Sequence, residues 1–275
     1  MKLIELINCI KKEYKIDYLD IKKLIKESFN VDNSYFIFNE NKEIEEEKTS
    51  EILKKCKEIK NGKPLQYVTN IQNFFGLKFY VDENVLIPQP DTEILVEEAI
   101  ERIKKIIDLK GIKKVKVLDL CTGSGAIAIS IKNELKEKVE VYASDISKKA
   151  LNVAKKNAEL ILKDEKISFI ESDMFNSIEE KFDVIVSNPP YIKTEVIKTL
   201  DKEVQEEPMI ALDGGYDGLK FYKEIRNEIE NHLEDDGILL MEIGYDQKEE
   251  LLNLFKNAIC IKDFADNDRV IIWKR

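Results

Sequence analysis

Apolar residues recur every three or four positions along the beginning of the chain, which is the spacing of amphipathic helices. Leu3, Ile7 and Ile10 form one such series, with lysine and glutamate among the residues between and after them. The segment NGKP at 61 to 64 is typical of a turn that ends a helix. This pattern predicts a small N-terminal helical domain over residues 1 to 70.

The pattern changes over the next twenty residues. Aromatic and β-branched residues cluster around Gly76, as they do in a β-hairpin. We therefore expect residues 71 to 92 to form a hairpin linker. Asp91 is a candidate N-cap for a following helix, whose apolar face would be made of Leu95, Ala99, Ile103 and Ile106.

From residue 93 to residue 275, strand-like apolar runs alternate with helical patterns. The predicted strands are Val115 to Leu120, Val139 to Ser144, Ile167 to Ile170, Val184 to Ser187, Ile238 to Ile243, Ile259 to Lys262 and Val270 to Trp273. This alternation predicts an α/β fold with a seven-stranded, mostly parallel Rossmann-like sheet covered on both faces. The connection Asp263 to Arg269 is too short for a helical crossover, so the last two strands should be antiparallel. Methyltransferase sheets end in this way, and nicotinamide-binding sheets rarely do.

A glycine-rich turn follows the first predicted strand. In VKVLDLCTGSGAIAIS, Gly123 and Gly125 stand where the backbone must approach a ligand closely. Asp145 ends the next strand, where a carboxylate can accept hydrogen bonds from ribose hydroxyls. The turn does not match the G-x-G-x-x-G pattern of nicotinamide enzymes. These features indicate an adenosine-containing cofactor, with an ordinary strand-to-helix turn as the alternative.

Two further residues follow the third predicted strand at the same sheet edge. Asp173 and Met174 stand where a carboxylate and an apolar side chain would hold an adenine ring. Packing in the core accounts equally well for Met174.

The tetrapeptide Asn188-Pro189-Pro190-Tyr191 directly follows an apolar strand and should lie beside the cofactor turn. The two prolines make the backbone rigid and hold its carbonyls in fixed directions. A planar amide or exocyclic amine is a poor nucleophile with two N–H donors. The Asn188 side-chain oxygen and the Pro189 carbonyl can accept both, and Tyr191 offers an aromatic face. The tetrapeptide therefore predicts methylation of an amide-like nitrogen.

The charge distribution disfavours a protein that binds nucleic acid through its phosphates. The formal net charge is −10. Residues 1 to 70 carry 14 positive and 13 negative charges, which leaves 30 positive and 41 negative for the rest of the chain. We therefore expect no stable binding of nucleic acid.

Cysteine and histidine usage points to a reducing compartment and no metal. Cys9, Cys56, Cys121 and Cys260 form no C-x-x-C pair. His232 is the only histidine, which argues against a site built from several imidazoles. No signal peptide or apolar run of membrane-spanning length is evident. We expect a soluble, cytoplasmic protein without a metal site or membrane association.

The chain resembles the release-factor glutamine N5-methyltransferases, which modify the glutamine of the Gly-Gly-Gln loop in peptide-chain release factors. The likeness covers roughly residues 60 to 275. It rests on GKPLQYVTN at 62 to 70, FFGLKFYVDENVLIPQPDTEILVE at 74 to 97, DLCTGSGAIAI at 119 to 129, SNPPYI at 187 to 192 and EPMIALDGGYDGLKFY at 207 to 222. The resemblance implies S-adenosylmethionine as methyl donor, S-adenosylhomocysteine as product and release factors as partners. It also implies a helical domain, a hairpin linker and a class I methyltransferase domain.

Site residues carry over by position. The resemblance assigns most of the cofactor residues, and Asp173 is added because it follows the third predicted strand. The predicted cofactor residues are Cys121, Thr122, Gly123, Ser124, Gly125, Asp145, Asp173, Met174 and Asn188. The substrate residues are Asn188, Pro189, Pro190 and Tyr191, with Asn188, Pro189 and Tyr191 as the catalytic group.

The sequence departs from the family pattern in three places. Cys121 stands where the family usually has glycine, so we expect a negative backbone φ there. Gln89 replaces the arginine of an I-P-R-P segment. Residues 1 to 55 match the family only in pattern, and we expect the helical domain to dock the protein substrate.

Two other classes remain open. DNA adenine-N6 and ribosomal RNA guanine-N2 methyltransferases use Asn-Pro-Pro-Tyr or close variants on an exocyclic amine. They generally need a basic surface or a target-recognition segment, and this chain shows neither. A non-enzymatic adaptor that only binds the cofactor would not require the acceptor residues at 188 to 191.

Overall fold

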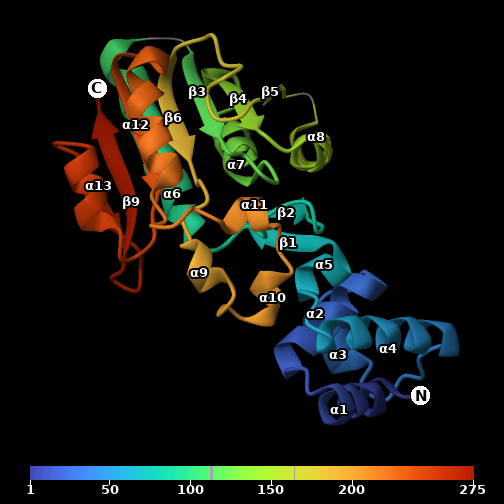
Figure 1. Ribbon diagram of the computed structural model, residues 1–275. Helices are drawn as coiled ribbons and strands as arrows, with labels where there is room; N and C mark the ends of the chain where they lie inside the picture. Colours follow the sequence, from blue (N-terminus) through green and yellow to red (C-terminus); the bar gives the residue numbers. More distant parts are fainter. Residues whose placement is uncertain (112–113, 164) are drawn as a thin grey trace. The chain divides into compact units, whose positions relative to one another are not determined.

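The computed structural model describes residues 1–111, 114–163 and 165–275, and these form two compact units (Figure 1). The first unit contains Met1–Ile71 together with Asp201–Glu206. The second contains Gln72–Leu200 and Glu207–Arg275. The short helix α10 (Lys202–Gln205) therefore packs with the N-terminal helices, although it is distant from them in sequence.

The first unit is helical, as predicted. Its other helices are α1 (Leu3–Tyr14), α2 (Tyr18–Phe29), α3 (Ser34–Phe38), α4 (Glu46–Lys60) and α5 (Leu65–Thr69). The Asp17 side chain caps α2 by accepting hydrogen bonds from the backbone nitrogens of Leu19, at 2.6 Å, and Asp20, at 3.2 Å. The apolar faces of these helices meet in a single core.

The second unit is built on a seven-stranded sheet of order β5-β4-β3-β6-β7-β9-β8. Its strands are β3 (Val115–Leu120), β4 (Val139–Asp145), β5 (Ile167–Glu171), β6 (Phe182–Ser187), β7 (Leu233–Glu242), β8 (Ile259–Lys262) and β9 (Asp268–Lys274). The first five strands in this order are parallel, while β9 is antiparallel to both neighbours. The seven strands and the antiparallel ending are confirmed.

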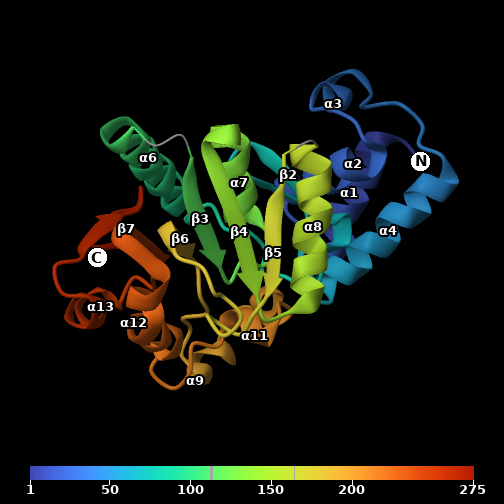
Figure 2. The same ribbon diagram turned by 90° about the horizontal axis from the view of Figure 1, so that it is seen from above.

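Helices cover both faces of this sheet (Figure 2). One face packs against α6 (Thr92–Lys110), α7 (Ala126–Leu135) and α8 (Lys148–Leu162), and the other against α12 (Lys220–His232) and α13 (Lys248–Leu254). The predicted apolar stripe of α6 is buried. Short helices complete the unit: η1 (Lys136–Lys138), α9 (Thr194–Ile197) and α11 (Met209–Leu212). Within the described ranges, no helix is long and apolar enough to cross a membrane.

A hairpin of β1 (Ile71–Phe74) and β2 (Leu77–Tyr80) precedes the sheet. It turns at Phe75 and Gly76, whose φ angles of 50° and 71° suit a tight hairpin turn. The buried Asn157 of α8 fastens β2 to α8 within the second unit. Its Oδ1 accepts from the Tyr80 nitrogen at 2.7 Å, and its Nδ2 donates to the Tyr80 carbonyl at 2.9 Å. The same Nδ2 donates to the Ser124 carbonyl at 2.9 Å, so one side chain joins the hairpin to the glycine-rich turn.

Candidate active site

A cavity of about 250 Å³ opens at the carboxyl ends of β3, β4, β5 and β6. This is where an open parallel sheet binds its ligands. Among the predicted site residues, the cavity wall contains Cys121, Thr122, Gly123, Ser124, Asp145, Asp173, Met174, Asn188 and Pro190. Gly125, Pro189 and Tyr191 are not among its lining residues.

The glycine-rich turn rests on a buried carboxylate. Asp119 is fully buried, and its Oδ2 accepts from the Thr122 hydroxyl at 2.6 Å and from the Ala128 nitrogen at 3.0 Å. Burial raises the pKa of Asp119 to about 7. Asp119 was not among the residues predicted for the site, although a lone acid inside the apolar run VLDL is a usable signal. Asp119 holds the turn and the start of α7 together.

The prediction of a negative φ at Cys121 is wrong, because its φ is 64°. Contacts on both sides dictate this conformation. The Leu120 carbonyl accepts from the Ser187 hydroxyl at 2.7 Å, and the Thr122 nitrogen donates to the Ser144 carbonyl at 2.9 Å. The left-handed conformation costs a non-glycine residue about 1 kcal/mol. The Cys121 sulfur lies 3.9 Å from the Met174 sulfur.

The two glycines of the turn serve different purposes. At Gly123 (φ 54°) an added Cβ would meet nothing within 4 Å, so the residue leaves room on the cavity side. At Gly125 (φ 81°) an added Cβ would lie 2.9 Å from the Ile129 Cδ1 and 3.3 Å from the Ala154 Cα. Gly125 therefore permits the close packing of α7 on α8, and it does not line the cavity.

Asp145 presents its carboxylate to the cavity in a fixed orientation. Its Oδ2 accepts from the Gly123 nitrogen and its Oδ1 from the Ser147 nitrogen, each at 2.8 Å. Burial raises the pKa of Asp145, while the two backbone hydrogen bonds oppose that rise. Each carboxylate oxygen keeps a second lone pair that can accept from a ribose hydroxyl. The carboxylate thus fits the predicted role.

We expect Asp145→Ala to weaken binding of S-adenosylmethionine by about 1 to 3 kcal/mol, the range for losing charge-assisted hydrogen bonds. Titration calorimetry on the folded variant measures this directly. Glu171→Ala is the matched control, because Glu171 is an exposed acid at the end of the neighbouring strand and does not line the cavity. An unchanged affinity in Asp145→Ala would remove this residue from the cofactor site.

The position of Met174 is compatible with both roles predicted for it. It lines the cavity, and at 9% exposure it also packs in the core on the α12 side of the sheet. Its backbone is held at a positive φ of 47°, and its carbonyl accepts from the Ser172 hydroxyl at 2.8 Å. Asp173 is exposed at the cavity rim.

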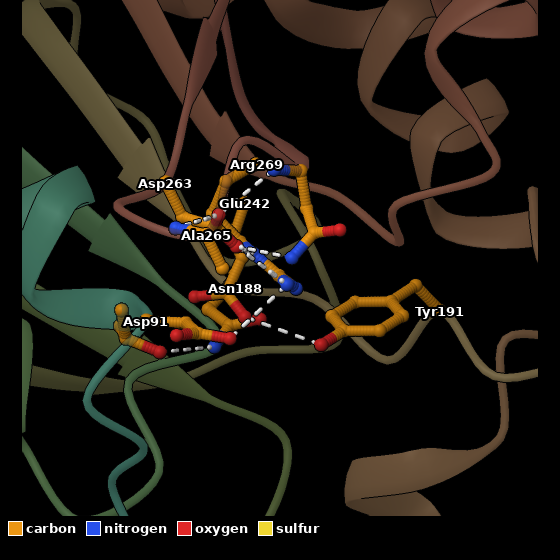
Figure 3. Close-up of polar contacts among 9 residues, drawn as sticks. Asp91, Asn188, Tyr191, Glu242, Asp263, Ala265 and Arg269 are labelled. Atoms are coloured by element: carbon orange, nitrogen blue, oxygen red, sulfur yellow. Dashed lines mark hydrogen bonds and ion pairs between the residues drawn. The ribbon is translucent and has the colours of Figure 1, made fainter.

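The side chains of Asn188 and Tyr191 are anchored to different elements (Figure 3). The Asn188 Nδ2 donates to the Thr92 hydroxyl oxygen at 3.2 Å. The Tyr191 hydroxyl donates to the Glu242 Oε1 at 3.2 Å. Burial, followed by the nearby Glu242 charge, raises the pKa of Tyr191, which therefore stays a neutral donor.

Glycines enclose the backbone of Tyr191. A Cβ on Gly214 would lie 2.7 Å from the Tyr191 Cα, and one on Gly218 would lie 2.5 Å from the Tyr191 carbonyl oxygen. The Gln247 Nε2 donates to that same carbonyl at 3.0 Å. The segment ALDGGYDG therefore packs closely against the backbone of the tetrapeptide. Two motifs that are distant in sequence thus form one part of the structure.

An ionic cluster, in which Arg269 and Asp263 are buried and Asp91 is exposed, lies beside the tetrapeptide. The Arg269 guanidinium contacts the Asp91 carboxylate at 3.0 Å and the Asp263 carboxylate at 3.1 Å. Asp91 occupies the N-cap position of α6, but its side chain makes no capping hydrogen bond, so the predicted capping role is corrected to an ion pair. The backbone of Asp91 has helical angles, φ −63° and ψ −29°, instead of the extended angles that are typical of a capping residue, so its side chain does not cap α6.

Several cavity residues were not selected from the sequence. Those before α6 are Asn84, Val85, Leu86, Pro88 and Gln89, Thr92 is the first residue of α6, and those nearer the C-terminus include Ile210, Ala211, Lys220 and Phe221. Gln89, which replaces the family arginine, lines the cavity and donates from Nε2 to the Ile87 carbonyl at 2.9 Å. In the sequence, these segments could be recognised only as parts of the family motifs at 74 to 97 and 207 to 222, and nothing in them marked single residues as part of a cavity.

Glu207 joins two of these segments and makes stability depend on pH. It is 8% exposed, and its Oε2 accepts from the Ile87 nitrogen at 2.9 Å. Burial raises its pKa to about 7 from an ordinary 4.5. The folded state thus binds this proton more tightly, so the stabilisation is complete below 4.5 and is lost as pH rises through about 7.

We expect the free energy of unfolding to fall between about pH 5 and about pH 8, and Glu207→Gln to remove on the order of 2 kcal/mol of that fall. The neutral amide oxygen can still accept from Ile87 without a buried charge. Urea unfolding at both pH values provides the measurement. Glu195→Gln, at an exposed position, should follow the wild type. Identical pH dependence in wild type and Glu207→Gln would contradict the assignment.

Known proteins share both the sequence and the fold. The family model "Methyltransferase small domain" matches residues 93–210. The release factor glutamine methyltransferase of Clostridium acetobutylicum is 40% identical, over 93% of this chain and 90% of that protein. The chain belongs to the release factor glutamine methyltransferase family. The protein of the same name from Thermodesulfovibrio yellowstonii is 36% identical, over 100% of this chain and 99% of that protein.

A solved structure agrees with this membership at the level of the fold. The T. thermophilus 16S rRNA N2 G1207 methyltransferase, in complex with AdoMet and guanosine, superposes with a TM-score of 0.53. The two chains are 18% identical, and the match covers 74% of this chain and 49% of the other. The predicted class I methyltransferase fold and the family resemblance are both confirmed.

Proposed function

We propose that this protein transfers a methyl group from S-adenosylmethionine to the side-chain amide nitrogen, N5, of the glutamine in the Gly-Gly-Gln loop of peptide-chain release factors. S-adenosylhomocysteine would be the product. The observation that carries the proposal is the position of Asn188, whose amide lies in the wall of the same cavity as Gly123 and Asp145. Membership of the release factor glutamine methyltransferase family supports the choice of substrate.

The cavity has the chemistry that S-adenosylmethionine requires. Asp145 would accept from the ribose hydroxyls, and Met174 with Asp173 would hold the adenine. Because Gly123 has no side chain, the space beside the glycine-rich turn stays open for the cofactor. When bound, the cofactor supplies an electrophilic methyl group on its sulfonium.

The tetrapeptide would prepare the amide nitrogen for methylation. The Asn188 Oδ1 and the Pro189 carbonyl accept the two N–H groups, which orients the nitrogen and favours its more pyramidal form in the transition state. The face of Tyr191 would support the planar amide. No charged base is needed before transfer, since the nitrogen releases its proton afterwards to water.

The remaining parts of the proposal concern partners and location. We assign docking of the release factor to the helical segment 1 to 70, the linking role to 71 to 92 and catalysis to 93 to 275. A substrate that acts in translation implies a cytoplasmic enzyme. No stable complex with nucleic acid is proposed, since the catalytic part is acidic.

The test uses S-adenosylmethionine labelled on its methyl group. Separate reactions contain a purified release factor, duplex DNA or ribosomal RNA, and mass spectrometry locates the label. We expect label on the glutamine of the Gly-Gly-Gln loop. Label on adenine or guanine would instead support a nucleic-acid methyltransferase, and cofactor binding without any transfer would support an adaptor.

A further inference from the structure

One buried glutamine joins three segments at the carboxyl end of β7. Gln247 is 4% exposed, and its Nε2 donates to the Tyr191 carbonyl at 3.0 Å and to the Gly218 carbonyl at 3.1 Å. Its Oε1 accepts from the Gly244 nitrogen at 2.9 Å. A single side chain thus connects the tetrapeptide, the segment ALDGGYDG and the turn that follows β7.

The three partners fix the direction of the Gln247 amide. A backbone carbonyl can only accept a hydrogen bond, and a backbone N–H can only donate one. A flipped amide would turn its oxygen toward the carbonyls of Tyr191 and Gly218. It would also turn its nitrogen toward the N–H of Gly244, so all three hydrogen bonds would be lost. Gln247 therefore presents two donors to the carbonyls in the folded protein.

Glycines make room for this amide. A Cβ on Gly218 would lie 2.7 Å from the Gln247 Nε2, and one on Gly244 would lie 2.9 Å from its Oε1. Both distances are too short for a side chain. Gly218 and Gly244 are themselves buried, so the hydrogen bonds form away from water. A carbonyl that lost its donor here would gain little from solvent.

Tyr191 is held both at its hydroxyl and at its backbone. Its hydroxyl donates to the Glu242 Oε1 at 3.2 Å (Figure 3), and its carbonyl accepts from Gln247. The nitrogen of the same peptide group, that of Ile192, donates to the Leu212 carbonyl at 3.0 Å. The two prolines restrict the backbone only up to the residue before Tyr191. The placement of the tyrosine ring therefore depends on these contacts beyond the prolines.

We propose that Gln247 is a positioning residue of the methyl transfer, whose amide fixes the Tyr191 end of the tetrapeptide and keeps the tyrosine ring in place for the substrate amide. Gln247 does not line the cavity, so it acts on the substrate only through Tyr191. The inference rests on the proposed function, in which the tetrapeptide binds the substrate glutamine.

Replacing the amide with a carboxyl makes this role depend on pH. In Gln247→Glu, an ionised carboxyl could still accept from Gly244, but its second oxygen would repel the carbonyls of Tyr191 and Gly218. A protonated carboxyl has one hydrogen and restores one of the two donors. Burial and the facing carbonyl oxygens both favour the protonated form. The variant should therefore recover part of its function as the pH falls.

The charged side chains that adjoin this site already have partners. The pairs are Asp246 with Lys193, Lys248 with Asp268, Asp217 with Lys223, and Glu242 with the Tyr191 hydroxyl. Each of these three lysines has an acidic partner, and the acids oppose a further negative charge. The carboxyl introduced in Gln247→Glu should thus stay protonated to a higher pH than an exposed one.

The experiment compares full-length Gln247→Met and Gln247→Glu with the wild type in single-turnover reactions on a Gly-Gly-Gln peptide at saturating S-adenosylmethionine. Gln247→Met keeps the length of the side chain and removes all three hydrogen bonds. We expect it to be slower than the wild type by about 10-fold to 100-fold at every pH, the range for a misplaced preorganised group. Gln247→Glu should be equally slow at about pH 9 and should recover at least about threefold, relative to the wild type, at about pH 6.

Two controls separate positioning from general damage. Gln66→Glu introduces the same charge at a half-buried position on α5 and should match the wild type at both pH values. Affinity for S-adenosylmethionine should be unchanged in all three variants, because Gln247 does not line the cavity. Gln247→Glu compares one protein with itself at two pH values, so it carries the test even if Gln247→Met does not fold. A wild-type rate in Gln247→Met, or a deficit in Gln247→Glu that is the same at both pH values, would contradict the proposal.

A second measurement does not depend on methyl transfer. Fluorine NMR follows protein labelled with 3-fluorotyrosine, and the Tyr191 signal is assigned by its loss in Tyr191→Phe. This signal should be displaced in Gln247→Met, and in Gln247→Glu it should be displaced at about pH 9 and return toward the wild-type position at about pH 6. A Tyr191 signal that stays in place in both variants would overturn the inference. A protein that shows these displacements but methylates no glutamine would instead overturn the proposed function alone.

Discussion

Asn188→Ala should lower turnover by roughly two to three orders of magnitude, comparable with the loss of one preorganised hydrogen-bonding group in a transition state. Asn188 lies in the cavity wall, where its Oδ1 would accept from the reacting nitrogen. The loss should appear in kcat, because the hydrogen bond strengthens as the nitrogen becomes pyramidal. Single-turnover kinetics with saturating S-adenosylmethionine isolate this step.

The variant should keep its fold and its cofactor. The Asn188 side chain is half-buried and donates to Thr92 alone among the described residues, so its removal disturbs little packing. Circular dichroism and cofactor titration provide the check. Asn231→Ala, an exposed position on α12, is the matched control. A near-normal single-turnover rate in Asn188→Ala would refute the acceptor role.

Replacing Leu19, Ile37 and Phe38 together with serine should lower methylation of an intact release factor at least about tenfold, while a Gly-Gly-Gln peptide is methylated as before. Acceptors at 188 and 189 treat any reachable glutamine alike, so selectivity must come from contacts elsewhere. These side chains, on α2 and α3, are 71%, 76% and 81% exposed. Large exposed apolar side chains mark candidate contact surfaces. Initial rates on the two substrates give the comparison.

The control places the same change on the catalytic unit. Leu109 on α6 and Leu160 on α8 are 86% and 62% exposed, and their double replacement with serine should leave both rates unchanged. Equal losses on protein and peptide in the α2 and α3 variant would show that the helical unit supports folding of the catalytic unit. The full chain is used throughout, because α10 completes the first unit and would lose its partners in a truncation.

The helices and strands could be predicted from the sequence because each depends on residues that are close together in the chain. The strand β3 has the predicted bounds Val115–Leu120, since an uninterrupted apolar run between polar turns suits a strand buried on both faces. The apolar stripe of α6 was readable for the same reason, as residues three and four apart share a helix face. The antiparallel ending followed from the length of one connection.

The same locality placed the chemical motifs at one edge of the sheet. Parallel strands bring their carboxyl ends together, so a glycine-rich turn after β3, an acid at the end of β4 and a tetrapeptide after β6 had to be neighbours. The cavity walls contain residues from all three. The family resemblance added the partner, which no local spacing could reveal.

The sequence by itself determined the strands, the helices and the motifs that meet at the cavity, because each depends on residues close together in the chain. The tertiary structure alone decided the positive φ of Cys121, the ion pair between Asp91 and Arg269, and the hydrogen bond from Asn188 to Thr92. These features depend on how the sheet twists and how each connection crosses it. Side chains far apart in sequence contact one another only after those paths are set, so no spacing along the chain encodes them.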